Sequence, residues 1–178
     1  MIDTPVEKEW RVLASRANNG KKIWSFTDSG AAVTDPVIGT DKNIYIGTDD
    51  GNINCINNGK LKWSVKINSK SIYNPAVSFD GTIYVGSDKG LYAIDPDGSI
   101  IWAYDAIVVE SPFIGRDGII YSGISDKNLY AFNNDGVIKW KHEANGNVTS
   151  PGAIGSNGVI CFGTDANSLN AVNRDGTK

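Results

Sequence analysis

Short apolar runs alternate with polar turn residues along the whole chain. The runs are rich in Val, Ile, Tyr and Trp, which favour β-strands, and the Asp-Gly or Asn-Gly pairs between them favour tight turns between antiparallel strands. The clearest group of runs occupies residues 73–79, 82–87, 90–95 and 99–104. No segment keeps an apolar period of about 3.6 residues over the length of a helix. The pattern predicts an all-β fold built from groups of four antiparallel strands.

This group of four strands recurs in tandem. Tryptophan, proline and glycine each mark the repeat, at spacings of 37 to 40 residues. The markers are Trp24, Trp63, Trp102 and Trp140; Pro36, Pro75, Pro112 and Pro151; and Gly47, Gly86, Gly123 and Gly163. Four antiparallel strands in about 40 residues, repeated along a chain, are typical of β-propeller blades. We therefore predict a β-propeller whose repeats occupy 21–178, with about four blades at residues 28–66, 67–105, 106–143 and 144–178.

The aligned repeats resemble those of a known family. Their shared sequence, SP-x-IG-x-DG-x-IY-x-G followed by LYA-x-N-x-DG-x-x-x-W, is similar to the repeat of the quinoprotein-type (PQQ-like) β-propellers, and the similarity covers residues 28–178. In that family, the Trp that follows a turn glycine by four positions docks on the neighbouring blade. The resemblance implies this docking role for Trp24, Trp63, Trp102 and Trp140. Because a blade packs both faces against its neighbours, we also expect these large side chains to be buried between blades.

The two ends of the chain look like parts of one blade. Residues 1–20 form a lead-in, in which 12–20 are expected as a degenerate third strand and turn, and 21–27 are expected as a fourth strand. The copy at 144–178 ends before its own fourth strand. We expect 21–27 to pair with 168–173, because a ring closed in this way has no open edge. Since the family usually uses seven or eight blades, the chain is expected to be about half of a ring, completed by a homodimer partner or by further sequence.

Composition and charge narrow the classes of partner. The chain carries 17 Lys and Arg against 20 Asp and Glu, a formal charge of -3, so it has no basic excess with which to bind nucleic acid. No apolar run approaches the about 18 residues of a membrane span, and the first residues lack the pattern of a signal peptide. The sequence predicts no transmembrane segment and assigns no compartment.

Few residues are of the types that hold a cofactor or a metal. The quinone-dependent dehydrogenases of similar fold hold PQQ with an adjacent cysteine pair, a stacking Trp, and carboxylates plus an Asn around Ca²⁺. Here Cys55 and Cys161 are far apart and are expected as packing residues, and Trp10 is the one Trp outside the repeat register. His142 is the only histidine, and Asp-Gly segments such as 49–52 are expected as tight turns rather than Ca²⁺ loops. We predict no cofactor, with PQQ and Ca²⁺ as the alternative.

One set of polar residues is predicted to surround a channel. Asp35, Asn74, Ser111 and Ser150 precede the repeat prolines and should surround one mouth of the propeller, with Glu110 beside them. One hypothesis is a non-catalytic scaffold that binds a protein or peptide partner through its loop face or channel mouth, as the resemblance to the outer-membrane assembly lipoprotein propellers implies. The alternative is part of a quinone-dependent dehydrogenase. The lack of cofactor ligands favours the scaffold, and fold resemblance alone does not establish an activity.

Overall fold

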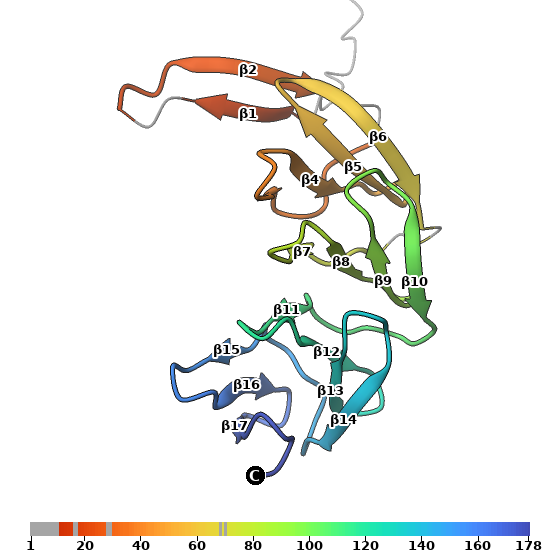
Figure 1. Cartoon of the computed structure of the whole chain (residues 1–178), viewed down its shortest axis with the longest axis vertical. Helices are drawn as coiled ribbons and strands as arrows, with labels where there is room; N and C mark the ends of the chain where they lie inside the picture. Colours follow the sequence, from red (N-terminus) through yellow and green to blue (C-terminus); the bar gives the residue numbers. More distant parts are fainter. Residues whose placement is uncertain (1–10, 16–17, 28–29, 68, 70) are drawn as a thin grey trace, which may run out of the picture.

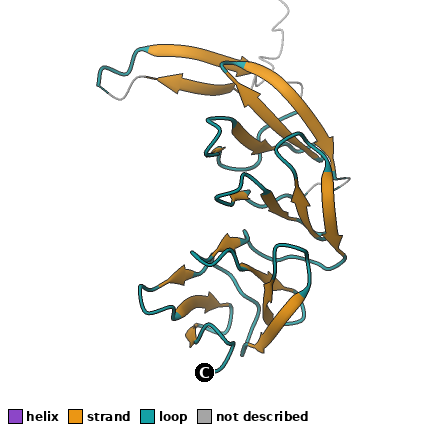
Figure 2. Ribbon diagram, viewed as in Figure 1, coloured by secondary structure: helices purple, strands orange, loops and turns teal. Residues whose placement is uncertain are grey.

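The computed structural model describes residues 11–15, 18–27, 30–67, 69 and 71–178, and in these residues all regular structure is β (Figures 1 and 2). In the described residues, seventeen strands form five antiparallel sheets, and the strands that pair within a sheet are consecutive in the chain. Three sheets have four strands, one has three and one has two. The predicted all-β fold with four-stranded antiparallel blades is confirmed.

The three complete blades contain twelve of the strands. Blade 1 contains β3 (Val37–Ile38), β4 (Ile44–Gly47), β5 (Asn52–Asn57) and β6 (Lys60–Lys66). Blade 2 contains β7 (Ala76–Val77), β8 (Ile83–Gly86), β9 (Leu91–Ile94) and β10 (Ile100–Tyr104). Blade 3 contains β11 (Phe113–Ile114), β12 (Ile120–Ile124), β13 (Asn128–Phe132) and β14 (Ile138–Glu143). The terminal sheet contains β15 (Ala153–Ile154), β16 (Ile160–Thr164) and β17 (Ser168–Val172), and the N-terminal hairpin contains β1 (Arg11–Ser15) and β2 (Lys22–Thr27).

The sheets follow one another along an open arc (Figure 1). The outer strands β6, β10 and β14 lie on its convex side, and β7, β11 and β15 lie on its concave side. The hairpin β1–β2 lies at one end of the arc and β17 at the other, so the ring is not closed. A partial propeller, rather than a closed ring of four blades, is therefore the architecture of this chain.

The innermost strands are shorter than the sequence predicts. The apolar run 73–79 suggests a long first strand in blade 2, but β7 has only two residues, and Ile72 forms an isolated bridge to Ser87. Pro75 interrupts the run. Because proline has no N–H to donate, strand pairing breaks around it and resumes at β7. The pre-proline residues therefore lie in a gap of the innermost strand.

Adjacent blades pack through apolar side chains of their second and third strands. Tyr45, Ile53 and Cys55 of blade 1 form one buried cluster with Ile83 and Val85 of blade 2, and the same arrangement recurs between the following sheets. Burial of such side chains is the main stabilising contribution to the array.

The structure corrects the expected pairing at the chain ends. β2 pairs with β1 over Arg11–Ser15, so the degenerate strand expected in residues 12–20 is present and occupies the edge of β2. The expected pairing of 21–27 with 168–173 is therefore wrong for a single chain, in which β17 has a partner on one side only. The two ends are too far apart along the arc to meet (Figure 1). Trp10 lies outside the described residues.

Candidate functional site

The repeat tryptophans lie against turns of the next sheet. The indole Nε1–H of three of them donates a hydrogen bond to a backbone carbonyl in the turn between the third and fourth strand positions. The pairs are Trp63 with Pro96 (2.8 Å), Trp102 with Asn134 (2.7 Å) and Trp140 with Arg174 (2.8 Å). A glycine in each turn makes room for the ring, because an added Cβ at Gly136 would lie 2.8 Å from Cδ2 of Trp102. These contacts fix how one sheet sits on the next.

The tryptophans are less covered than the sequence suggests. Trp24, Trp63, Trp102 and Trp140 are half-buried rather than buried. Each lies on a fourth-strand position, and the rings of Trp63, Trp102 and Trp140 also lie beside a tyrosine of their own blade. Trp24 also contacts the next turn, since a Cβ added at Gly59 would lie 3.2 Å from Cβ of Trp24.

The residues predicted at the channel mouth join the blades to one another. Asp35 and Asn74 exchange two hydrogen bonds, from Asp35 N–H to Asn74 Oδ1 (2.9 Å) and from Asn74 Nδ2 to Asp35 Oδ2 (3.0 Å). Asn74 N–H in turn donates to Ser111 Oγ (3.2 Å), and Ser111 N–H donates to Glu110 Oε1 (2.7 Å). The structure thus brings Asp35, Asn74 and Ser111 together across three blades.

Ser150 does not join this series. Its Oγ accepts a hydrogen bond from Gly163 N–H within the terminal sheet (3.0 Å). Much of the polar capacity at the mouth is therefore used within the protein, and this leaves few groups free to recognise a ligand.

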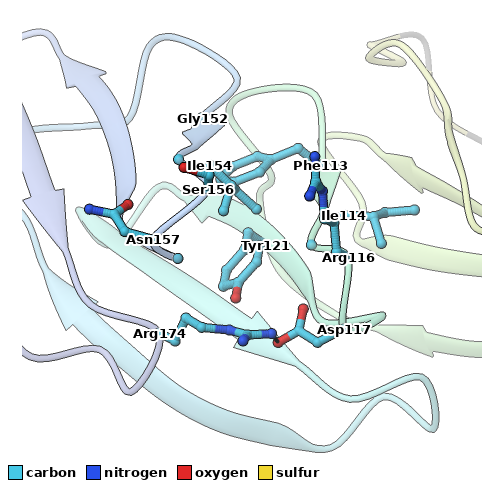
Figure 3. A pocket seen from close by; sticks show the side chains of 13 residues that line it. Phe113, Ile114, Arg116, Asp117, Tyr121, Gly152, Ile154, Ser156, Asn157 and Arg174 are labelled. Carbon is cyan, nitrogen blue, oxygen red and sulfur yellow. Dashed lines mark ion pairs between the residues drawn. The ribbon is translucent and has the colours of Figure 1, made fainter.

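The opposite side of the arc carries the turns that join first to second strands and third to fourth strands; we call it the turn face. A cavity of about 370 Å³ lies on this face between blade 3 and the terminal sheet, and Figure 3 shows the side chains that line it. Phe113 and Tyr121 stack in its wall with ring centroids 5.2 Å apart. Across it, the Arg174 guanidinium lies 2.5 Å from Oδ2 of Asp117 (Figure 3). The cavity combines an aromatic wall with an ion pair at its rim.

The ion pair affects ionisation of the carboxyl group. Partial burial opposes the charged form of Asp117, but the hydrogen bond from Arg174 and bonds from backbone N–H groups favour it more strongly. The net effect is a pKa below the usual range for aspartate. Asp117 therefore remains a carboxylate at neutral pH.

A second cavity of about 460 Å³ lies on the turn face between blades 2 and 3. Phe79 is at its rim, and 96% of this residue is exposed. The corresponding turn positions of the other copies carry Thr40, Arg116 and Ser156, so Phe79 is the one apolar residue at this position of the repeat. The sequence analysis did not single out Phe79 or Arg174, although this contrast between copies was a signal for Phe79.

The residues present do not fit the quinone cofactor that the dehydrogenases of similar fold hold. Cys55 is buried in β5 and Cys161 lies in β16, so they form no adjacent pair, and burial raises the pKa of the Cys55 thiol to about 11. The carboxylates at the mouth, Asp35 and Glu110, are already hydrogen-bonded to neighbouring residues. Within the described ranges no three His, Cys, Asp or Glu side chains are placed to hold a metal ion.

His142, the one histidine of the sequence, packs between two sheets. It is half-buried in β14, and its Nδ1 lies 3.0 Å from the carbonyl oxygen of Gly176. Its ring meets Phe162 edge-on at 6.4 Å. These contacts give His142 a packing position between blade 3 and the terminal sheet.

Comparison with known proteins identifies a family whose sequence model matches this chain. A family model described as outer membrane protein assembly factor BamB matches residues 8–113 and again residues 73–178. No curated protein matches the sequence. Among the residues that the structure describes, no helix has the length and apolar character needed to cross a membrane.

Solved structures share the fold at low sequence identity. BamB from Moraxella catarrhalis has a TM-score of 0.82 at 16% identity, over 95% of this chain and 54% of that chain. The WD40 β-propeller domain of Doa1 has a TM-score of 0.72 at 20% identity, over 86% of this chain and 54% of that chain. BBS1N, solved in complex with ARL6DN, has a TM-score of 0.71 at 14% identity, over 90% of this chain and 53% of that chain. This chain therefore spans about half the length of these propellers.

Proposed function

Because the chain belongs to the outer membrane protein assembly factor BamB family, we propose that it is a non-catalytic β-propeller scaffold that binds a protein or peptide partner through its turn face. The proposal selects this face over the channel mouth. At the mouth, Asp35, Asn74 and Ser111 bond to one another across the blades. On the turn face, aromatic and charged groups border two cavities.

The single observation that carries the proposal is the exposure of Phe79. Its phenyl ring stands in solvent at the rim of a cavity of about 460 Å³. A fully exposed aromatic ring has no stabilising role in the folded chain, whereas aromatic anchors beside pockets contribute much of the binding energy at protein interfaces. Covering this ring would gain about 1.5–3 kcal/mol of hydrophobic free energy.

The charges beside Phe79 indicate the chemistry of the partner. Asp80, Asp117 and Lys139 line the same cavity, and Arg116 lies on the turn between this cavity and the next. A partner with one apolar side chain and charged groups of both signs around it would complement this surface. The related BBS1N propeller was solved with a protein partner, which supports a protein or peptide ligand here.

Selection from a random peptide library tests the proposal. The 178-residue protein would be immobilised, and enriched peptides would then be assayed by fluorescence anisotropy against the Phe79→Ser variant. We expect binding to weaken at least 10-fold in Phe79→Ser, and to be unchanged in Ile101→Ser, a matched loss of an exposed apolar residue on the outer strand β10. Equal binding to all three proteins, or no enriched peptide, would contradict the proposed turn-face site.

A further inference from the structure

We propose that two copies of this chain form one closed ring of eight blades by exchanging β2. In this ring, β2 of each copy leaves β1 and becomes the fourth strand of the other copy's terminal sheet. The proposal does not depend on the partner-binding function. It rests on four features of the two chain ends, taken in turn below.

The terminal sheet has a face that no sheet of the described residues covers. Leu169 occupies the repeat position of Ile53, Leu91 and Leu129, which are 0% exposed between blades, yet Leu169 is 77% exposed. Ala171 shows the same contrast with its buried counterpart Ala131. The side chains that the repeat buries against a following blade are therefore present on this sheet, and none of the described residues packs on them as a following blade.

A glycine on this sheet also marks a missing neighbour. In blade 2, a Cβ added at Gly86 would lie 2.5 Å from Cγ1 of Val108 in blade 3, so only glycine allows the two sheets to approach this closely. The equivalent Gly163 of the terminal sheet meets no following sheet, and an added Cβ there would contact only Ser150. In the single chain, no neighbouring sheet among the described residues makes the close contact that Gly163 would permit. In the ring, Ala32 of the second copy would take the position of Val108.

The other end of the arc has the matching gap. β1 and β2 occupy the positions of the third and fourth strands of a blade, and no described residue forms a first or second strand beside them. A cavity of about 470 Å³ lies between β1 and blade 1, where those strands would pack, and Leu13 and Val33 in its wall are 61% and 45% exposed. The three strands of a second copy's terminal sheet would cover this wall.

The docked tryptophans determine whether β1 or β17 is displaced when the two ends meet. β1 at one end and β17 at the other both occupy the third-strand position of a blade. A completed blade contains only one strand at that position. The turn after β17 is held by Trp140, whose Nε1 bonds the Arg174 carbonyl and whose ring lies 2.7 Å from the Cβ position of Gly176. In the described part of the turn after β1, Gly20 has no such contact, because nothing lies within 4 Å of its Cβ position. β17 therefore stays in place and β1 is displaced.

The exchanged ring leaves no docking position empty. Trp24, on the exchanged β2, still docks on Gly59 of its own blade 1, and Trp140 still docks on Gly176 of the completed terminal sheet. Two copies give eight blades, within the range of about four to eight that propellers use. The exchange replaces a two-stranded hairpin, which is marginally stable alone, by a four-stranded blade, and the interface should exceed about 2,000 Å².

The intact blades give the register of the new pairing. Trp102 lies opposite Ala93 in blade 2, and Trp140 lies opposite Ala131 in blade 3. The same register places Trp24 opposite Ala171 of the second copy, and hence Ser25 opposite Asn170. Within one chain, Ser25 lies opposite Leu13 of β1. Ser25 thus has a different neighbour in each state.

Paired cysteines at these positions distinguish the two states. The background is Cys55→Ala with Cys161→Ser, so that no natural thiol competes. Directly opposed residues of an antiparallel pair have Cα atoms about 4.5–5.5 Å apart, within the range that a disulfide spans. We expect oxidation of Ser25→Cys with Asn170→Cys to link two chains covalently. If that variant does not fold, Thr27→Cys with Ser168→Cys probes the same register two residues further along β2.

The matched control is Ser25→Cys with Leu13→Cys, which locks β1 onto β2 within one chain. The unmodified 178-residue protein should have a mass by light scattering of about twice the 19.1 kDa of one chain, and the oxidised control should fall to the mass of one chain and recover on reduction. A monomeric unmodified protein, an open-ended series of larger masses, or a dimer that persists in the oxidised control would each overturn the exchange. A monomer would instead favour completion of the ring by further sequence or by a different protein.

Discussion

The indole N–H of Trp102 donates a 2.7 Å hydrogen bond to the carbonyl of Asn134, which belongs to the next blade. Trp102 also packs beside Tyr84 of its own blade, with ring centroids 5.8 Å apart, and stacks on Phe132 of the next blade at 6.3 Å. One side chain therefore contacts both sheets of an interface. The recurrence of this contact along the chain explains why four similar copies produce a regular arc.

Replacing Trp102 tests this contact. Trp102→Ala should lower the free energy of unfolding by about 3 kcal/mol, the lower end of the range for large-to-small core changes, because the ring is half-buried. Trp102→Phe keeps an aromatic ring and loses the bond to Asn134, so it should cost only about 1 kcal/mol. Urea unfolding followed by circular dichroism measures both values. A near-neutral Trp102→Ala would contradict the docking role.

Substitution of two glycines with similar backbone angles distinguishes the cost of backbone strain from the cost of a clash with the docked Trp ring. Gly136 has φ +81° and lies under the Trp102 ring, whereas Gly118 has φ +78° and nothing within 4 Å of its Cβ position. Gly118→Ala should therefore cost only the left-handed backbone strain, about 1–2 kcal/mol. Gly136→Ala adds a clash with the indole and should cost about 1–3 kcal/mol more. If thermal or urea unfolding showed equal losses of stability for both variants, close contact between the Trp102 ring and Gly136 would not be needed.

The positions of the strands could be predicted from the sequence more closely than their lengths. The run 82–87 corresponds to β8 within one residue at each end, because Asp80-Gly81 precedes it and the turn 88–90 follows it. The run 73–79 was predicted as one strand, but β7 is two residues long, since Pro75 cannot donate to the sheet. The strand propensity of the residues does not reveal that pairing of the inner strand is interrupted around a proline.

The candidate site was only partly predictable, for a different reason. Register within the repeat brought Asp35, Asn74 and Ser111 to one place, and their hydrogen bonds across the blades follow from that register. The same reasoning treats equivalent turns as alike, so it overlooked Phe79 and the contact between Arg174 and Asp117. Those features depend on side chains that differ from one copy to the next.

The ion pair of Asp117 and Arg174 predicts a pH dependence of stability. Because the pKa of Asp117 is lower in the folded chain than in the unfolded chain, its contribution is fully present above the unfolded pKa and is lost as the pH falls through the folded pKa. Both side chains are partly exposed, so the effect should stay below about 1 kcal/mol. Urea unfolding at pH 7 and pH 3 should show a smaller difference for Arg174→Gln than for the unmodified protein. If the stability difference between pH 7 and pH 3 were the same for both proteins, Arg174 would not be the cause of the pH dependence.

The protein should not take up the quinone cofactor of the dehydrogenases that have a similar fold. Cys55 and Cys161 lie in different sheets, and the mouth carboxylates already have partners. Titration with PQQ and Ca²⁺, followed by absorbance and a dye-linked alcohol oxidation assay, should show neither stoichiometric binding nor dye reduction. Stoichiometric uptake with turnover would place the chain among the enzymes and would contradict the scaffold.

Hydrogen exchange in β1 and β17 is the most direct test of ring closure by a second copy. In the exchanged ring, the amides of β17 that point away from β16 bond to β2 of the other copy, and β1 has lost its partner. We therefore expect slow exchange throughout Ser168–Val172 and fast exchange in Arg11–Ser15, with the difference diminishing on dilution as the dimer dissociates. Protected amides in β1 together with rapidly exchanging outer amides in β17, at every protein concentration, would contradict closure by strand exchange.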